Sequence, residues 1–294
     1  MVSFGSRPSS VIRGGRAISK KIIVPFAILL MLLFASNLPA QGIPKLSVHS
    51  AILMDMTTGR LLLAHNADDP LQPASITKVL SLYLADEAIR DGKVRRTDKV
   101  KISKKAGQTG GSKMFLQAGS EIQLAELLKG MAVVSANDAS VAVAEYIGGN
   151  VEDFVKRMNG KARELGMNHS FFKNPNGLPA RGQFTTARDM LILACDYLRQ
   201  FPESIDLHSQ QYYTYRDITQ RNRNSLLRNY PNADGLKTGW VSKAGYHIVA
   251  TAKRGNTRLI AVVMGAKTSK IRARETEKLL DEGFKMVQEK PRQG

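Results

Sequence analysis

Two residues that could form a catalytic pair, Ser75 and Lys78, lie three positions apart in the segment SITK. Residues at this spacing share one face of a helix, so the Lys78 amine can reach the Ser75 hydroxyl. A serine attacks a carbonyl only if a base removes its proton, and a lysine can be that base when burial or a neighbouring cation lowers its pKa. Backbone N–H groups at the helix start could hold the resulting oxyanion. Taken alone, the pattern more often marks a serine that caps a surface helix.

A second hydroxyl and a carboxamide occur in the segment SAN, in a break between two predicted helices. Ser135 could relay a proton there, and Asn137 could hydrogen-bond a substrate amide. The alternative is that Asn137 or Asp138 only caps the helix that follows.

A third motif, KTG, precedes a predicted strand near the end of the chain. Lys237 and Thr238 could bind a substrate carboxylate, and Gly239 would let the backbone approach a ligand closely. Taken by itself, this segment would be explained by a simple turn. In the order SxxK, SxN and KTG, however, the three motifs form the triad of penicillin-binding proteins and class A β-lactamases.

The elements that must position these motifs follow from the hydrophobic pattern. Two hairpins are predicted near the chain ends, one from Ala51–Met54 and Leu61–Ala64, the other from GYHIVATA and TRLIAVVMGA. Helices are predicted over residues 76–90, 124–133, 139–147, 151–165 and 187–197, and a last helix presents Leu279, Leu280, Phe284 and Val287 on one face. Strands from both chain ends with helices between them predict an α+β fold, an antiparallel sheet with helices packed on it.

The first 40 residues have the layout of a secretory signal. Five basic residues and no acid occur in residues 1–21, an apolar run follows over Ile22–Ala35, and Ala40 could precede a cleavage site. The run is shorter than the roughly 20 apolar residues of a membrane span, although an uncleaved anchor stays open. We therefore expect an exported protein of the periplasm or cell envelope, with one catalytic domain over residues 41–290.

The net charge of +18 bears on the class of partner. Nucleic acid would suit so basic a chain, but the export signal argues against it. An anionic polymer of the cell envelope or anionic lipid headgroups fit better, so peripheral association with a membrane stays open. Cys195, the only cysteine, lies in an apolar helical pattern and is interpreted as a buried hydrophobe. The scattered histidines lack metal-ligand spacing, so we expect no metal.

Longer segments carry a family resemblance. NADDPLQPASITKVLSLYLA, LLKGMAVVSANDASVAVAE, ELGMNHSFFKNPNGL and DGLKTGWVSKAGYHIVATAKRGNTRLIAVVMGA, spread over residues 46–287, resemble the low-molecular-mass penicillin-binding proteins that act as D-alanyl-D-alanine carboxypeptidases. The resemblance implies a three-layer α/β/α arrangement, the antiparallel sheet flanked by helices of the penicillin-recognising serine transferases. It also implies substrates that are peptidoglycan stem peptides ending in D-Ala-D-Ala, and β-lactams as inhibitors.

The resemblance also implies roles for residues at the motif positions. Ser75 would attack the peptide carbonyl, Lys78 would take its proton, and the backbone N–H groups of Ser75 and Trp240 would hold the oxyanion. Ser135 matches a proton-relay position, and Asn137 matches an amide-binding position. Lys237 matches a conduit position, and Thr238 a position that binds the terminal carboxylate. Arg272 matches an arginine that steers the carboxylate. No cofactor is implied.

Two departures from the family leave alternatives open. Many members have histidine where this chain has Trp240, which could change rate, inhibitor profile or substrate choice. Many also continue into a second β-rich domain, whereas we expect none here, and the short form also resembles endopeptidases that cut cross-links. A β-lactamase would need a glutamate that holds a water molecule, and Glu164 with Asn168 is a candidate for this role. We favour the other interpretation of this segment, in which Gly166 ends a helix. A non-catalytic peptidoglycan-binding protein is the last alternative.

Overall fold

A five-stranded antiparallel sheet lies at the centre of the described part of the chain. The computed structural model describes residues 45–288, so the export signal predicted at residues 1–40 lies outside this range. The strand order is β2-β1-β9-β8-β7. The strands are β1 (Ser50–Asp55), β2 (Arg60–His65), β7 (Ala233–Val241), β8 (Gly245–Arg254) and β9 (Thr257–Ala266). Both predicted hairpins are confirmed, and β7 adds a fifth strand at one edge.

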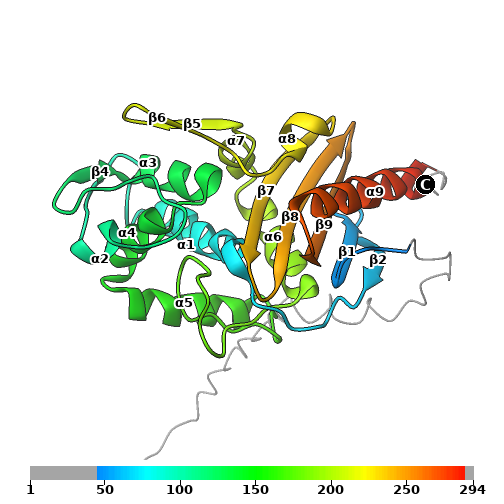
Figure 1. Ribbon diagram of the computed structural model, residues 1–294, viewed down its shortest axis with the longest axis horizontal. Coiled ribbons are helices and arrows are strands. Elements are labelled where there is room, and N and C mark those ends of the chain that lie inside the picture. Colours follow the sequence, from blue (N-terminus) through cyan, green and yellow to red (C-terminus); the bar gives the residue numbers. More distant parts are fainter. Residues whose placement is uncertain (1–44, 289–294) are drawn as a thin grey trace, which may run out of the picture. The chain divides into compact units, whose positions relative to one another are not determined.

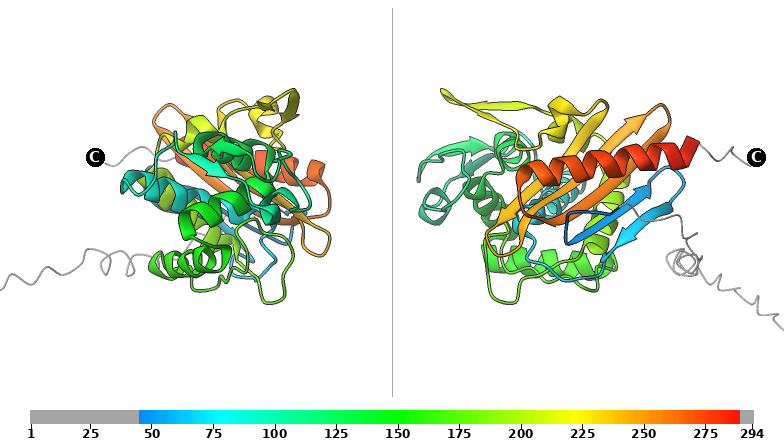
Figure 2. Two further views of the ribbon diagram at one scale, coloured as in Figure 1. Left: turned by 90° about the vertical axis from the view of Figure 1, so that its left-hand side faces the viewer. Right: turned by 45° about the vertical axis from the view of Figure 1, so that its right-hand side comes forward.

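Helices cover both faces of this sheet (Figure 1). The long helix α9 (Ser269–Gln288) lies across one face, where its Leu279, Leu280 and Phe284 join Leu53 and Leu259 in one apolar cluster (Figure 2). The other face packs against α1 (Lys78–Arg90) and α6 (Ala187–Gln200) in a second, larger apolar cluster. The predicted three-layer α+β fold is therefore confirmed.

The chain between β2 and β7 is mostly helical, as predicted. Besides α1 and α6, it contains α2 (Lys104–Gly107), α3 (Leu124–Lys129), α4 (Asn137–Gly148), α5 (Val151–Glu164), α7 (Ser204–His208) and α8 (Leu226–Asn229). Two short strand pairs were not predicted as such: β3 (Lys99–Lys101) with β4 (Glu121–Gln123), and β5 (Tyr212–Tyr215) with β6 (Ile218–Arg221).

The predicted helix over residues 124–133 is interrupted, and the interruption positions the SAN motif. Helix α3 ends at Lys129, a π-helical turn follows over Gly130–Val134, and Ser135 takes a left-handed conformation with φ 65°. A Cβ at Gly130 would collide with the Met114 sulfur, so glycine here leaves room for that buried side chain. Helix α4 then begins at Asn137 with Ala136 at the cap position. The interpretation of Asn137 or Asp138 as a mere helix cap is therefore wrong.

Candidate active site

The Ser75 hydroxyl lies on a tight turn that two glycines make possible. A 3₁₀ turn over Ala74–Thr77 precedes α1, and Ala74 has a positive φ of 49°. A Cβ at Gly177, which has φ +81°, would collide with the Ala74 carbonyl, and a Cβ at Gly239 would lie 3.1 Å from the Ser75 nitrogen. The KTG segment of β7 therefore packs directly against the backbone of the candidate nucleophile.

The Lys78 amine is the most deeply buried charged group beside Ser75. Its side chain has no solvent exposure, and Nζ lies 3.0 Å from Ser75 Oγ, 2.7 Å from Asn137 Oδ1 and 2.8 Å from the Asn176 carbonyl oxygen. Burial, reinforced by the positive charges of Lys237 and Arg223, lowers its pKa well below the ordinary lysine value. Lys78 therefore has the lowered pKa that a lysine needs to act as a base.

The SAN motif joins this pair through Asn137. Its Oδ1 accepts from Lys78, and its Nδ2 donates to the Gly110 carbonyl at 2.8 Å. Ser135 is 3% exposed and lies two residues before it, on the left-handed turn. The glycine-rich segment GQTGGSKM thus borders the site through the Gly110 carbonyl.

The neighbouring Asp138 was not predicted to contribute beyond a cap. It is fully buried, and its two oxygens accept from the Met114 and Leu116 backbone nitrogens at 3.1 Å each. The carboxylate therefore fixes the loop that carries Gly110, whose carbonyl accepts from Asn137 Nδ2. In the sequence, only the position of Asp138 directly after the SAN motif could have suggested this role.

The KTG motif lies on the edge strand β7 and adds a second buried amine. Lys237 is 2% exposed, and its Nζ donates to the Thr238 carbonyl oxygen at 3.0 Å. Burial and the charges of Arg223 and Arg272 lower the pKa of Lys237 to about 7. Thr238 is 5% exposed, whereas Trp240 is 56% exposed and its ring lies 5.9 Å from that of Tyr246.

Arg272, in the first turn of α9, has a buried guanidinium whose N–H groups are only partly hydrogen-bonded. Its Nη2 donates to the Arg223 carbonyl at 3.2 Å, but its Nε is buried without a hydrogen-bond partner in the described chain. Burial lowers its pKa to about 10, so it still carries a positive charge at neutral pH. An unpaired buried N–H of a cation is costly, and an anion would satisfy it.

Two residues that sequence reasoning did not single out complete the frame. Asn176 supplies the carbonyl that holds Lys78. His247, fully buried on β8, accepts from the Gly265 N–H through Nδ1 and contacts the Gln72 carbonyl through Nε2, both at 3.0 Å. Both lie in segments that carry the family resemblance, but neither belongs to one of the three motifs.

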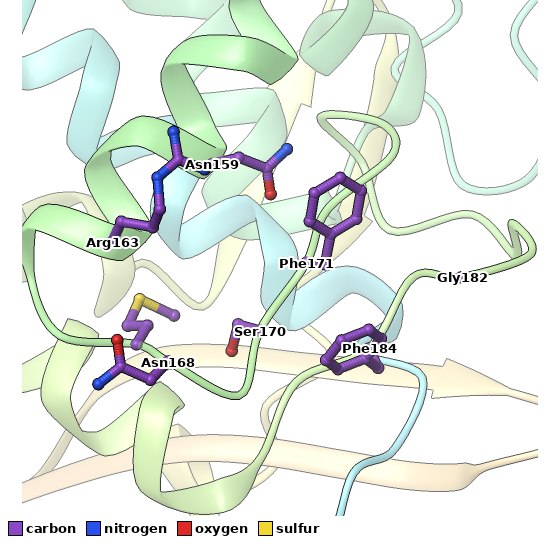
Figure 3. A pocket seen from close by; sticks show the side chains of 8 residues that line it. Asn159, Arg163, Asn168, Ser170, Phe171, Gly182 and Phe184 are labelled. Carbon is purple, nitrogen blue, oxygen red and sulfur yellow. The ribbon is translucent and has the colours of Figure 1, made fainter.

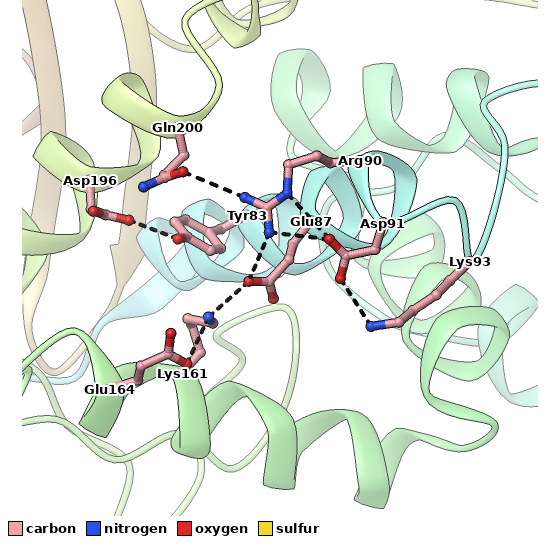
Figure 4. Close-up of polar contacts among 9 residues, drawn as sticks. All are labelled: Tyr83, Glu87, Arg90, Asp91, Lys93, Lys161, Glu164, Asp196 and Gln200. Carbon is pink, nitrogen blue, oxygen red and sulfur yellow. Dashed lines mark hydrogen bonds and ion pairs between the residues drawn. The ribbon is translucent and has the colours of Figure 1, made fainter. Parts of the chain in front are cut away.

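The two residues weighed for a β-lactamase lie on the helix α5 and the chain after it. Glu164 is 66% exposed and pairs with Lys161 at 2.8 Å, within the polar network that ties α5 to α1 (Figure 4). Asn168 lines a surface groove beside Ser170 and Phe171 (Figure 3). Gly166 ends the helix region with φ +82°, as predicted. Neither residue hydrogen-bonds Ser75 or Lys78.

Comparison with known proteins agrees with this geometry. The family model described as D-alanyl-D-alanine carboxypeptidase matches residues 37–268. The D-alanyl-D-alanine carboxypeptidase DacC of Escherichia coli is 42% identical over 252 residues, which cover 83% of this chain and 63% of that protein. The chain thus spans less than two thirds of this curated relative.

Two solved structures share the fold. Penicillin-binding protein 5 from Haemophilus influenzae superposes with a TM-score of 0.81 at 41% identity, covering 83% of this chain and 72% of that chain. Penicillin-binding protein D2 from Listeria monocytogenes, in its ampicillin-bound form, gives a TM-score of 0.76 at 29% identity, covering 83% and 100%. The resemblance drawn from the motifs is confirmed, and the chain belongs to the D-alanyl-D-alanine carboxypeptidase family.

Proposed function

We propose that this protein is a serine hydrolase that removes the terminal D-alanine from peptidoglycan stem peptides through an acyl-enzyme on Ser75. The observation that carries the proposal is the buried Lys78 amine, 3.0 Å from the Ser75 hydroxyl and with a strongly lowered pKa. A neutral amine at this distance can take the hydroxyl proton as the oxygen attacks. Membership of the family supports the same reaction.

Positioning of the scissile bond falls to backbone and carboxamide groups. The backbone N–H groups of Ser75 and Trp240 are proposed to hold the oxyanion, which needs no particular side chain at position 240. Asn137 is proposed to bind the substrate amide while it also holds Lys78. Ser135, buried beside them, is proposed to return the proton to the departing amine.

Recognition of the substrate terminus is proposed for the cationic end of the site. Lys237, Thr238 and Arg272 would bind the free carboxylate of the last D-alanine, with Gly239 leaving room for the backbone. The unpartnered Nε of Arg272 supports this role, because a carboxylate would complete its hydrogen bonds. β-Lactams carry a carboxylate at the matching place and are proposed to trap Ser75; the related Listeria protein is known with ampicillin bound.

The place of action is proposed from the first 40 residues. A basic segment followed by an apolar run fits export to the periplasm or cell envelope. Within residues 45–288 no helix is long and apolar enough to cross a membrane. The excess of basic residues would support a peripheral attraction to anionic headgroups.

Two assays test the proposal. A fluorescent penicillin should label the wild type and fail to label Ser75→Ala, and Lys78→Ala should slow labelling on the order of 10²-fold. Equal labelling of wild type and Ser75→Ala would refute the nucleophile. Incubation with muropeptides should release free D-alanine; split cross-links without free D-alanine would instead indicate an endopeptidase.

A further inference from the structure

A surface groove of about 430 Å³ between α5 and residues 167–184 has no role in the proposed reaction. Phe171 and Phe184 form one side of it, with 37% and 38% of their surfaces exposed (Figure 3). The two residues are held together by a pair of backbone hydrogen bonds, 2.9 and 3.0 Å long. The two exposed rings form an apolar surface, and the Lys173 Nζ lies over the Phe171 ring at 4.6 Å from its centroid. An exposed apolar patch rimmed by polar groups can mark a binding site.

Polar groups face these rings from the other side of the groove. Arg163 and Asn168 lie opposite the rings in Figure 3, and both are exposed. Within residues 45–288 neither side chain hydrogen-bonds another residue, and Arg163 forms no ion pair. The guanidinium offers five N–H donors, and the carboxamide offers two donors and an acceptor. Aromatic faces opposite free planar donors suit a ligand with an apolar face and a rim of oxygens, which is the chemistry of a sugar ring.

Two short connections tie this groove to the catalytic residues. Phe171 is five residues before Asn176, whose carbonyl holds the Lys78 amine at 2.8 Å. Phe184 precedes Thr185, which exchanges two backbone hydrogen bonds of 2.9 Å with Leu71, four residues before Ser75. Because an extended chain spans at most about 3.5 Å per residue, the groove lies within roughly 20 Å of the site.

This upper limit of about 20 Å is compatible with the length of the substrate. A stem peptide of five residues spans at most about 17 Å when extended. With its terminal D-alanine at Thr238 and its scissile bond at Ser75, the opposite end of the stem can reach this distance. The unit attached at that end is an amino sugar of the glycan strand.

We propose that the groove between Phe171, Phe184, Arg163 and Asn168 is a binding site for an amino-sugar unit of the substrate's glycan strand. The proposal rests on the proposed hydrolysis of stem peptides at Ser75. Sugar C–H faces would lie on the two rings, and hydroxyl and acetamido oxygens would accept from the guanidinium and the carboxamide. The site would then favour stems still attached to glycan over free peptides.

The test compares a free pentapeptide ending in D-Ala-D-Ala with the same peptide attached to its disaccharide. We expect the wild type to cleave the disaccharide form with about tenfold higher kcat/KM, mainly through a lower KM. The double variant Phe171→Ala/Phe184→Ala and the variant Arg163→Gln should lose this preference and keep the rate on the free peptide. Tyr146→Ala, which removes an exposed aromatic ring from α4 outside the groove, should leave the preference intact.

A binding measurement keeps the proposal independent of turnover. The peptide-free disaccharide should bind Ser75→Ala saturably in a titration followed by NMR, and adding Phe171→Ala/Phe184→Ala should abolish that binding. Equal kcat/KM for the two substrates in the wild type, or no binding of the disaccharide, would overturn the groove proposal alone. If neither substrate releases D-alanine, the proposed reaction itself is wrong, whereas saturable disaccharide binding would still support the groove.

Discussion

The ring of His247 links the sheet to the segment that ends in the nucleophile. Its Nε2 lies 3.0 Å from the Gln72 carbonyl oxygen, three residues before Ser75. Since Nδ1 accepts from the Gly265 N–H at 3.0 Å, the proton of the neutral ring must be on Nε2, where it donates to Gln72. Protonation would turn the acceptor into a second donor facing Gly265 N–H. The structure therefore requires this histidine to stay neutral.

The first prediction concerns stability against acid. Burial lowers the pKa of His247 to about 4, and that of the equally buried His208 also to about 4. Between pH 6.5 and 4 the unfolded chain binds protons that the folded chain does not, so stability falls as pH falls through this window. Each ring should cost about 2 kcal/mol by pH 5. Denaturant unfolding at pH 7.5 and 5 measures this loss.

A variant separates His247 from the general effect of acid on carboxylates. His247→Gln removes the titrating ring and should flatten the pH dependence of the unfolding free energy below pH 6.5, whatever it does to stability at pH 7.5. An unaltered slope in His247→Gln would contradict the buried-neutral assignment.

The second prediction concerns the pH dependence of acylation. If neutral Lys78 is the base, the acylation rate should fall as pH drops through its lowered pKa. The charge of Arg223 helps to lower the pKa of both Lys78 and Lys237. Arg223→Gln removes that charge and should move the acidic limb of the penicillin acylation profile toward higher pH. Arg228→Gln, on nearby α8, serves as the control.

The acylation profile of Arg223→Gln tests whether Lys78 is the base. A profile that does not move in Arg223→Gln, or that moves toward lower pH, would contradict the assignment of Lys78. Acylation measured under single-turnover conditions is needed, because steady-state rates could report the hydrolysis of the acyl-enzyme instead.

How far the sequence predicts this site depends on how local each signal is. Ser75, Lys78 and Asn137 were predicted from short motifs, and the hydrogen bonds of Lys78 bring them together. The antiparallel sheet and its helices followed from the periodicity of apolar residues, because burial on one face imposes that period.

The features that the sequence did not reveal depend on contacts between distant segments. His247 gains its role only because Gln72 and Gly265, far apart in the chain, meet it. Gly177 could be interpreted as one more turn glycine until the Ala74 carbonyl is seen beside its Cα. The π-helical turn before Ser135 was also missed, because its residues fit an ordinary helical pattern.

The third prediction tests the close approach of Gly177 to the Ala74 carbonyl. Gly177→Ala would place a methyl group against the Ala74 carbonyl and would also strain a residue with φ +81°. We expect at least about 1–3 kcal/mol of destabilisation and a strong loss of penicillin acylation. Gly182→Ala is a matched control, since Gly182 has a similar φ of +77° and meets only the end of the Lys173 side chain. Equal acylation by both variants would contradict the steric argument.

The fourth prediction tests the carboxylate role of Thr238 and Arg272. Thr238→Val keeps the side-chain volume but removes the hydroxyl, and Arg272→Gln removes the charge whose Nε is unpartnered. Each should reduce kcat/KM on a peptide with a free terminal carboxylate by roughly 10-fold or more, in line with about 1.5–3 kcal/mol for a charged hydrogen bond. A matched thioester or ester substrate without that carboxylate should be cleaved almost as before. An equal loss on both substrates would remove the carboxylate role.

The last prediction concerns Trp240, where many family members have histidine. The proposed oxyanion contact uses only the backbone N–H at this position, and the side chain is 56% exposed against Tyr246. Trp240→His and Trp240→Ala should therefore be acylated by penicillin at rates within a few-fold of wild type, far from the 10²–10³-fold loss of an oxyanion-hole donor. Their unfolding free energies should change by only about 1 kcal/mol, because little apolar area is buried. A loss of acylation as large as that of Lys78→Ala would show that the indole itself supports the reaction, and the backbone assignment would fail.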